Sequence, residues 1–359
     1  MICTKRLRGF RRLSSSNRRS FGCVKKDEMK KVVFSGIQPT GDAPHVGNYL
    51  GAMKRWVELQ DDEEAERLYS IVDLHALTTI GPNTNLRNQT REMTAALLAC
   101  GICPSRSIVY AQSDVVYHAE LSWILSCVTP INHLQRMTQY KEKKEKSPNL
   151  GLFAYPVLQA ADILLYRATH VPVGEDQAQH LELSRTIARS FNNFAGHKNL
   201  LIPPTAMISK QSETSRVQSL RDATKKMSKS DPSDMSRINL TDDADTIAKK
   251  VRKAKTDSEP GLSFDTNFRP GVSNLIAMYA SFRDLSVEHA MKEVQPQNMG
   301  GLKAALTEVL VEKVCPIGDK MRDLLSDCDY LDRILDEGGN RAREKAEKTM
   351  RDVRGALKL

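Results

Sequence analysis

The chain has 359 residues, enough for one large α/β domain and a smaller companion. Hydrophobic residues make up 40% and charged residues 27%, a balance that excludes both a disordered chain and a membrane-spanning one. The formal net charge of +9 favours a polyanionic partner, most often nucleic acid.

The whole positive excess lies in the first 26 residues. Nine of the 53 basic residues precede the first acid, Asp27, and the remaining 44 balance the 44 acidic residues. A basic, serine-containing segment without acids is typical of an organelle transit peptide, and the apolar core of a secretory signal is missing. We expect residues 1–29 to be a mitochondrial transit peptide and the protein to reach the mitochondrial matrix. A disordered RNA-binding arm and a nuclear signal are the alternatives.

Strand and helix patterns alternate through the first half of the chain. Strands are predicted at 31–36, 68–72, 107–111 and 170–173. Helices are predicted at 46–60, 88–99 and 118–128, from Pro156, and from an N-cap at Asp176 to about 191. This order predicts an α/β fold, a Rossmann-like doubly wound parallel sheet.

Two polar segments interrupt the pattern, and a helical region follows it. Residues 141–149 and 203–234 are predicted to be exposed loops, and from about residue 241 only helical spacing recurs. We therefore expect a catalytic domain over 30–235 and an α-helical C-terminal domain over 236–359. Cys100 and Cys103 lack a second pair or histidines at ligand spacing, so no metal site is expected.

A first motif joins the first strand to the first helix. It reads Ser-Gly-Ile-Gln-Pro-Thr-Gly over 35–41 and Pro-His-Val-Gly-Asn over 44–48. Ligands of open α/β sheets bind at this place, where a helix N-terminus favours negative charge. Gly47 leaves room for a flat base, and His45 and Asn48 can donate hydrogen bonds to phosphate oxygens in a transition state. Taken singly, the glycines and prolines are equally explained as turn formers.

A second motif, Lys226-Met-Ser-Lys-Ser230, lies in the second polar loop. Lys226 and Lys229 are flexible cations three residues apart, a spacing suited to clamping a departing pyrophosphate. The alternative is a lysine-rich loop that is merely solvated.

Together the two motifs resemble those of class I aminoacyl-tRNA synthetases. Residues 44–48 are similar to the His-Ile-Gly-His motif, and 226–230 match Lys-Met-Ser-Lys-Ser. The strings over 36–41, 160–166 and 171–177 look like tryptophanyl-tRNA synthetases. The resemblance covers residue 31 to the C-terminus and, with the leader, implies the mitochondrial form.

A tryptophan pocket is predicted from spacing and then from the resemblance. Tyr155, Gln159 and Asp162 share one helix face. The indole N–H only donates, so a selective pocket needs a buried acceptor such as Asp162. The resemblance implies that Phe34 and Gln177 complete the pocket. Gln159 departs from the methionine expected in many bacterial members, and His75 at a strand end is as well explained by a structural role.

The resemblance also implies the ATP site and the catalytic residues. ATP-binding residues are expected at Gln38, Gly47, Asn48, Lys141, Gly174, Glu175, Asp176, Val217, Lys226, Met227, Ser228, Lys229 and Ser230. The catalytic group is expected to be His45, Asn48, Lys226 and Lys229. Asn48 replaces an ionisable histidine, so catalysis should rest on hydrogen bonds and lysine charge rather than proton transfer.

The implied activity is tryptophan–tRNA ligation in two steps: formation of tryptophanyl-adenylate from L-tryptophan and ATP, then transfer to mitochondrial tRNA(Trp). Mg²⁺ is expected with ATP, a homodimer as the assembly, and neither a prosthetic group nor a membrane partner. Three alternatives stay open: a tyrosyl-tRNA synthetase, a small-molecule nucleotidyltransferase of the same superfamily, and an inactive RNA-binding descendant. Residues 340–359, with seven basic side chains against three acids, are a candidate tRNA surface.

Overall fold

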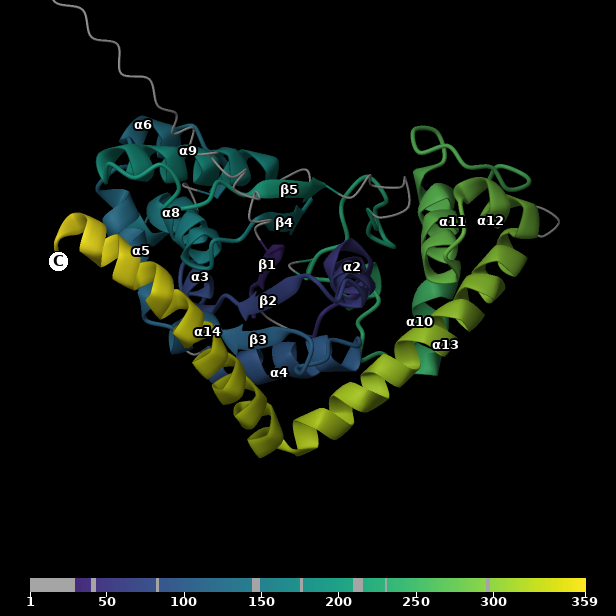
Figure 1. The fold of residues 1–359 in the computed structure, drawn as a ribbon. Coiled ribbons are helices and arrows are strands. Elements are labelled where there is room, and N and C mark those ends of the chain that lie inside the picture. Colours follow the sequence, from purple (N-terminus) through teal and green to yellow (C-terminus); the bar gives the residue numbers. More distant parts are fainter. Residues whose placement is uncertain are drawn as a thin grey trace, which may run out of the picture. The chain divides into compact units, whose positions relative to one another are not determined.

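Five parallel strands form the sheet at the centre of the structure (Figure 1), a computed structural model. The structure describes residues 30–39, 43–81, 84–143, 149–174, 177–208, 216–229, 231–294 and 298–359. The predicted transit peptide therefore lies outside the described residues. The strands are β1 (Val32–Ile37), β2 (Glu66–Ile71), β3 (Ile108–Ala111), β4 (His170–Val173) and β5 (Thr205–Ile208). They lie in the order β3-β2-β1-β4-β5.

Helices cover both faces of the sheet, which confirms the predicted doubly wound fold. The N-terminal helical elements are α1 (Val46–Asn48), η1 (Tyr49–Met53), α2 (Lys54–Glu58), η2 (Leu59–Asp61), α3 (Asp73–Ala76), α4 (Leu86–Ala99), η3 (Gln112–Asp114), α5 (Tyr117–Ser126), α6 (Ile131–Gln135), α7 (Thr138–Lys143), α8 (Leu150–Leu165) and α9 (Ala178–Phe194). Those that follow β5 are η5 (Asp234–Ser236), α10 (Ala244–Arg252), α11 (Pro270–Arg283), α12 (Val287–Val294), α13 (Met299–Ser326) and α14 (Cys328–Leu357).

Alternation along the strands divides the core into two layers. On β3, Ile108 and Tyr110 pack with α5, α8 and α9, whereas Val109 and Ala111 pack with α2 and α4. Successive strand side chains point to opposite faces, so a strand buried on both sides feeds both layers. The layer that contains Val109 and Ala111 also contains apolar side chains of α10, α11 and α13. The core is thus continuous across residue 235, and the division into two domains stays a prediction.

Three local predictions are wrong. Helix α8 begins at Leu150 rather than Pro156, because the side chain of Asn149 accepts the N–H of Leu152 and caps it. Pro156 is tolerated in the helix interior. Helix α7 also reaches into the predicted loop from residue 141. Helix α9 has Gln177 as its N-cap residue, without a side-chain hydrogen bond, and Asp176 lies outside the described residues.

A short edge strand, β5, was missed inside the second polar segment. It pairs with β4 over four residues, from His170 opposite Thr205 to Val173 opposite Ile208. Its only sequence signal is three apolar residues after two prolines, too short a run to separate from the polar loop that follows.

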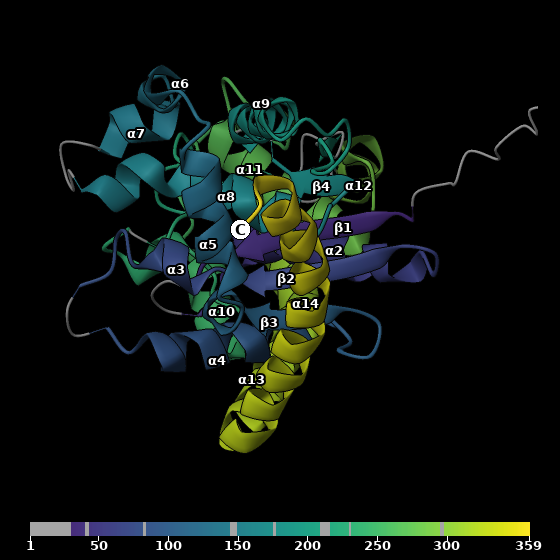
Figure 2. The same cartoon turned by 60° about the vertical axis from the view of Figure 1, so that its left-hand side comes forward.

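Helix α14 lies directly against β3 (Figures 1 and 2). A Cβ atom added at Gly338 would lie 1.8 Å from the carbonyl oxygen of Val109, so only glycine permits this approach. This helix follows all five strands in the chain, yet it lies along β3, an edge strand of the sheet. The C-terminal helical region is therefore built partly onto the sheet domain.

Candidate active site

The chain changes direction across the sheet between β1 and β4. From β1 it continues to β2 and β3 on one side, and then crosses to β4 and β5 on the other. Crevices at such switch points, beyond the carboxyl ends of the strands, are the usual ligand sites of open α/β sheets. Gln38 follows β1 directly and Gly174 follows β4, so two predicted ATP-binding residues flank this point.

His45 lies where the first helix begins and is almost completely buried. Its Nδ1 accepts the N–H of Gly47 at 3.1 Å, and the side-chain oxygen of Asn48 accepts the N–H of His45 at 3.1 Å. This reciprocal capping box fixes both side chains. It also places the His45 proton on Nε2, and leaves the NH₂ group of Asn48 as its donor.

His45 is a neutral group at physiological pH. Burial, followed by the positive charges of Lys229, Arg237 and Lys226, lowers its pKa to about 4. The imidazole can therefore donate a hydrogen bond from Nε2 without carrying a positive charge. This suits a donor aimed at developing negative charge rather than a proton shuttle.

The two sequence motifs meet in space. A Cβ atom on Gly47 would lie 2.9 Å from the His45 ring and 3.7 Å from Cβ of Met227, so a side chain here would displace the histidine. Met227 is buried in the core, while Lys226 is exposed and Lys229 half-buried. The methionine thus anchors the loop and the lysines flank it. We call His45, Gly47, Asn48 and residues 226–229 the signature centre.

The loop is anchored through its backbone at Val217. The N–H of Met227 donates to the carbonyl of Val217 at 3.0 Å, and Ser219 and Lys225 are bonded in the same way at 2.9 Å. The neighbouring N–H of Gln218 donates to the side chain of Asn274 on α11 at 2.8 Å. The base of the loop is therefore fixed by hydrogen bonds that do not use the lysine side chains.

Asp162 on α8 is the centre of a buried hydrogen-bond network and is 2% exposed. His75 Nε2 lies 2.8 Å from Oδ2, and His118 Nδ1 lies 2.7 Å from Oδ1. Gln112 Nε2 donates to Oδ1 at 2.6 Å. We call these four side chains the Asp162 cluster. Two donors saturate Oδ1, whereas Oδ2 retains one acceptor position.

The Asp162 carboxylate is ionised. Burial by itself favours the neutral acid, but the hydrogen bonds from His118 and His75 outweigh it and lower the pKa of Asp162 to about 2. Beneath the cluster, His118 Nε2 lies 2.9 Å from the Tyr166 hydroxyl and 3.2 Å from that of Tyr110. Burial raises the pKa of both phenols, so both hydroxyls keep their protons.

The other residues predicted for the tryptophan pocket lie around the same helix. Tyr155 Oη is 2.7 Å from His180 Nε2 on α9, and its ring meets the His75 ring edge-on at 6.2 Å. Gln159 Nε2 donates to Gln177 Oε1 at 3.4 Å. Phe34 on β1 is buried and stacks on Tyr166 at 5.8 Å between ring centroids. Ring contacts thus link Tyr155 to His75 and Phe34 to Tyr166, the partner of His118, whereas Gln159 and Gln177 are bonded to each other.

Comparison with known proteins indicates the same synthetase family as the two sequence motifs. The family described as "tRNA synthetases class I (W and Y)" matches residues 25–313. The chain belongs to this family. It is 50% identical over 352 residues to the tryptophan–tRNA ligase of Brucella melitensis, covering 90% of this chain and 97% of that one.

Two solved structures support the assignment to this synthetase family. The tryptophanyl-tRNA synthetase of Mycoplasma pneumoniae superposes with a TM-score of 0.81 at 32% identity, over 92% of this chain and 98% of that chain. That of Campylobacter jejuni, complexed with ADP and tryptophan, superposes with a TM-score of 0.77 at 33% identity, over 91% and 100%.

Four predicted ATP-binding residues of the synthetase lie on α7 or outside the described residues. Lys141 is exposed on α7. Glu175, Asp176 and Ser230 lie outside the described residues. Their roles, like those of the placed residues, stay predictions.

Sequence reasoning missed Gln112 and His118 of the Asp162 cluster. Gln112 directly follows β3, and His118 follows it by six residues. The rule that draws attention to the carboxyl ends of parallel strands identifies this position too. It does not reveal which polar side chain turns inward, because that depends on packing against α8.

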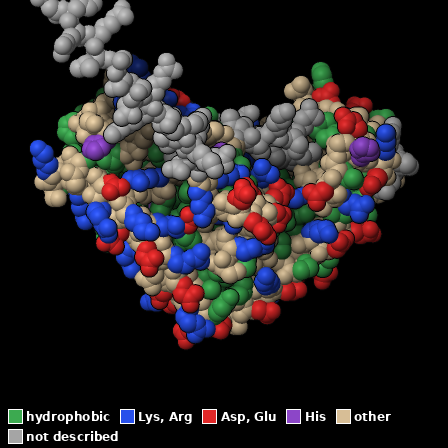
Figure 3. Space-filling model, viewed as in Figure 1, with side chains coloured by type: hydrophobic (Ala, Val, Ile, Leu, Met, Phe, Trp, Pro, Cys, Tyr) green, Lys and Arg blue, Asp and Glu red, His purple; other side chains and the backbone are tan. Residues whose placement is uncertain are grey.

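The basic C-terminal segment of the synthetase is largely occupied by internal contacts. Arg341 and Arg343 each donate to a backbone carbonyl, of Pro104 and Asp114, at 2.8 Å. In addition, two ion pairs join Lys345 to Glu66 at 2.5 Å and Arg354 to Glu120 at 2.6 Å. Four of the seven cations thus fasten α14 to the sheet domain. The face shown in Figure 3 carries both signs of charge interspersed.

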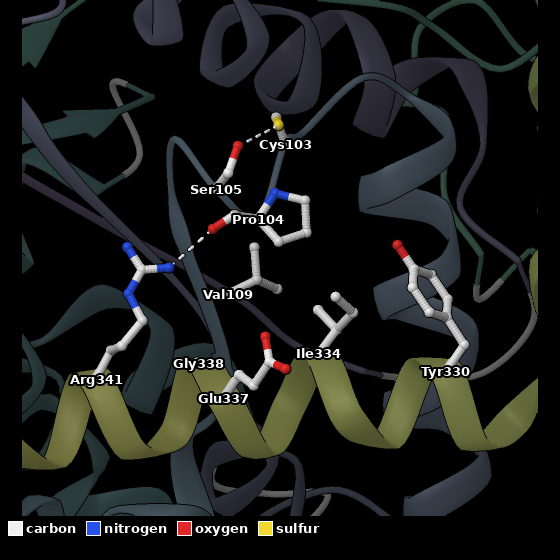
Figure 4. A pocket seen from close by; sticks show the side chains of 9 residues that line it. All are labelled: Cys103, Pro104, Ser105, Val109, Tyr330, Ile334, Glu337, Gly338 and Arg341. Atoms are coloured by element: carbon white, nitrogen blue, oxygen red, sulfur yellow. Dashed lines mark hydrogen bonds between the residues drawn. The ribbon is translucent and has the colours of Figure 1, made fainter.

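A cavity of about 360 Å³ lies between α14 and the loop at Cys103 (Figure 4). Pro104, Tyr330 and Arg341 contribute to its wall, and none of the residues predicted for ATP or tryptophan does. Within the described ranges, no three His, Cys, Asp or Glu side chains group as a metal site. In the same part of the chain, no helix is long and apolar enough to cross a bilayer.

Proposed function

We propose that this chain is a tryptophan–tRNA ligase. The observation that carries the proposal is the ionised, buried Asp162, with one acceptor position on Oδ2, in a chain whose His45 and Lys226 motifs lie side by side. The relative from Brucella melitensis, which is 50% identical to this chain, is named for the same activity. The substrates are L-tryptophan, ATP and tRNA(Trp).

In the first step, a carboxylate oxygen of tryptophan attacks the α-phosphorus of ATP. A bond forms between these atoms, the bond from the α-phosphorus to the bridging oxygen breaks, and pyrophosphate leaves. His45, as a neutral Nε2 donor, and the NH₂ group of Asn48 stabilise the charge on the phosphoryl oxygens. Lys226 and Lys229 hold the departing pyrophosphate. The attacking carboxylate carries no proton and pyrophosphate leaves as an anion, so this step needs no proton from His45.

In the second step, a terminal ribose hydroxyl of tRNA attacks the carbonyl carbon of tryptophanyl-adenylate. An ester bond forms, the bond from the carbonyl carbon to the phosphate oxygen breaks, and AMP leaves as the hydroxyl proton passes to its phosphate or to solvent. The amino acid is selected beforehand, because the open position on Asp162 Oδ2 accepts the indole N–H. Phe34, Tyr155, Gln159 and Gln177 complete the tryptophan pocket. A substrate without that N–H leaves the second acceptor position of the buried Oδ2 unused beside an apolar group, which is a basis for rejection.

ATP binds along the signature centre. Its contacts include Gln38, Gly47, Val217, Met227 and Ser228 beside the catalytic lysines, and Gly174 at the end of β4. Lys141, Glu175, Asp176 and Ser230 belong to the same proposed site. Mg²⁺ enters as the counter-ion of the ATP phosphates.

ATP–pyrophosphate exchange by the purified chain tests the activity. With tryptophan, we expect labelled ATP to form and tRNA(Trp) to be charged. Preference for tyrosine would assign the chain to the other branch of its family. Absence of amino-acid-dependent exchange would leave an RNA-binding protein.

A homodimer is proposed from an exposed apolar face on α5. Val116 is 67% exposed and Trp123 is 73% exposed, and seven residues of helix put them on one side. A second copy of this chain covers that face. Trp123→Arg should convert a dimer into a monomer in sedimentation equilibrium, and an unchanged mass would contradict this interface.

Mitochondrial location is proposed from the basic leader. The nine positive charges over residues 1–26 suit import, and the bacterial relatives are compatible with an organellar origin. A fluorescent protein carrying residues 1–29 should enter mitochondria. A nuclear or diffuse signal would contradict the proposal.

The helical region over 236–359 is proposed to contact the anticodon, with Lys348, Arg351 and Lys358 as exposed cations.

A further inference from the structure

The segment that follows the lysine loop pairs directly with the His45 segment. Val46 N–H donates to the carbonyl of Ile238 at 2.9 Å, and Leu240 N–H donates to that of Pro44 at 2.8 Å. His45 and Asn239 therefore lie opposite each other as an isolated antiparallel bridge. Any shift of residues 238–240 is transmitted through the backbone to His45.

A set of charges around the buried Lys250 fixes this same segment. Lys250 on α10 is 1% exposed, and its Nζ lies 2.7 Å from Asp234 and 2.6 Å from Asp242. Asp242 accepts the backbone N–H of Asn239 at 2.9 Å, and Asp234 accepts its side-chain NH₂ at 2.9 Å. Both carboxylates that hold Asn239 are thus held by one ammonium group.

Arg237 joins the network to the end of the lysine loop. Its guanidinium donates to the carbonyl of Asp231 at 3.1 Å and to the side-chain oxygen of Asn239 at 3.2 Å, and pairs with Asp234 at 3.4 Å. The side chain is 7% exposed. One cation therefore spans from the residue after Ser230 to the residue opposite His45.

The balance of charge argues for positioning rather than stability. Two cations, Lys250 and Arg237, face two anions, Asp234 and Asp242, so the network is formally neutral. Buried ion pairs often stabilise a fold no better than apolar residues of similar volume. What apolar side chains cannot do is hold the Asp231 carbonyl and both ends of Asn239 in fixed directions.

We propose that Lys250 and Arg237 are positioning residues for amino-acid activation: through Asp234, Asp242 and Asn239 they hold the end of the lysine loop in register with His45. Because Lys250 lies on α10, the network also joins the helical region to the signature centre. The inference rests on the proposed tryptophan activation. It predicts an effect on adenylate formation and none on the transfer step, which does not use the pyrophosphate clamp.

The test compares Lys250→Met with the matched control Lys249→Met, the exposed neighbour on the same helix. We expect Lys250→Met to lower kcat for tryptophan-dependent ATP–pyrophosphate exchange about 10-fold to 100-fold, in line with the effect of small misplacements of catalytic groups. KM for tryptophan should stay unchanged. Single-turnover transfer from isolated enzyme-bound adenylate to tRNA should also be unchanged. Lys249→Met should match the wild type.

Arg237→Lys is a second test of the same network, for use if Lys250→Met does not fold. It keeps the charge but cannot span three acceptors, so it should give a smaller loss in the same step only. Equal losses in exchange and transfer, or an unchanged kcat for exchange in both variants, would overturn the proposal. Failure of the wild type to exchange at all would instead overturn the proposed function.

Discussion

Around Asp162, side chains from distant parts of the chain are bonded to one another inside the protein. Around His45 and the lysine loop, the bonds are made mainly by the backbone, and the Lys226 side chain is exposed. The Asp162 carboxylate accepts three hydrogen bonds within 2.8 Å. The lysine loop is held by backbone bonds at Val217 and by buried Met227. Selection of one amino acid requires a rigid hydrogen-bond acceptor. A pyrophosphate that leaves during the reaction requires positive side chains that move with it.

Asp162→Asn should produce the largest effect. An amide offers one acceptor oxygen where two served, so its NH₂ group would face either His75 or both His118 and Gln112. Removing one partner of a buried pair costs about 3–5 kcal/mol. We expect kcat/KM for tryptophan in ATP–pyrophosphate exchange to fall about 10³-fold, with little change in KM for ATP.

Glu182→Gln is the control for Asp162→Asn. Glu182 lies on neighbouring α9, and its side chain is 58% exposed, so the same chemical change should leave tryptophan use intact. A normal kcat/KM in Asp162→Asn would show that the cluster does not select the substrate.

The two regions should lose stability at different pH. His45 has a folded pKa of about 4 against 6.5 unfolded, so its contribution is complete above pH 6.5 and is lost as pH falls towards 4. The loss approaches about 3 kcal/mol. The Asp162 pKa of about 2 lies below the ordinary 3.8, so its contribution persists above pH 3.8 and is lost towards pH 2.

Urea unfolding at several pH values checks this separation. Between pH 6.5 and 4, the wild type should lose more free energy of unfolding than His45→Gln, whose side chain does not titrate. Parallel curves for the two proteins would mean that His45 titrates at its ordinary pKa.

Lys229→Ala should lower the activation rate about 10²-fold, as expected for a contact made mainly in the transition state. Tryptophan affinity should be spared, because the loop takes no part in the Asp162 cluster. The control is Lys225→Ala, an exposed lysine of the same loop that pairs with Asp222 at 3.1 Å. Near-normal turnover in Lys229→Ala would refute the clamp.

The smallest effect is expected from Tyr155→Phe. This change removes the 2.7 Å contact with His180 and leaves the ring in place. One hydrogen bond of this kind contributes about 1 kcal/mol, so the Kd for tryptophan should rise about five-fold. Equilibrium titration measures it. A loss as large as that of Asp162→Asn would extend the Asp162 cluster to Tyr155.

The sequence by itself determined the features that depend on neighbouring residues. Alternation and turn residues gave four strands within about two residues of β1 to β4, because strand periodicity is a local property. The two motifs identified the family for the same reason, since each occupies a few consecutive positions. The start of α8 was harder to predict from the sequence. The prediction relied on Pro156, whereas the hydrogen bond of the N-cap residue Asn149 starts the helix at Leu150.

Only the tertiary structure decided which side chains meet. His75 is separated from Asp162 by 87 residues and His118 by 44, and no spacing rule connects them. The same holds for the basic residues of α14, which composition assigned to RNA and packing directed largely to the sheet domain. Long-range contacts follow from how helices and strands pack around one core, and a linear pattern does not contain that information.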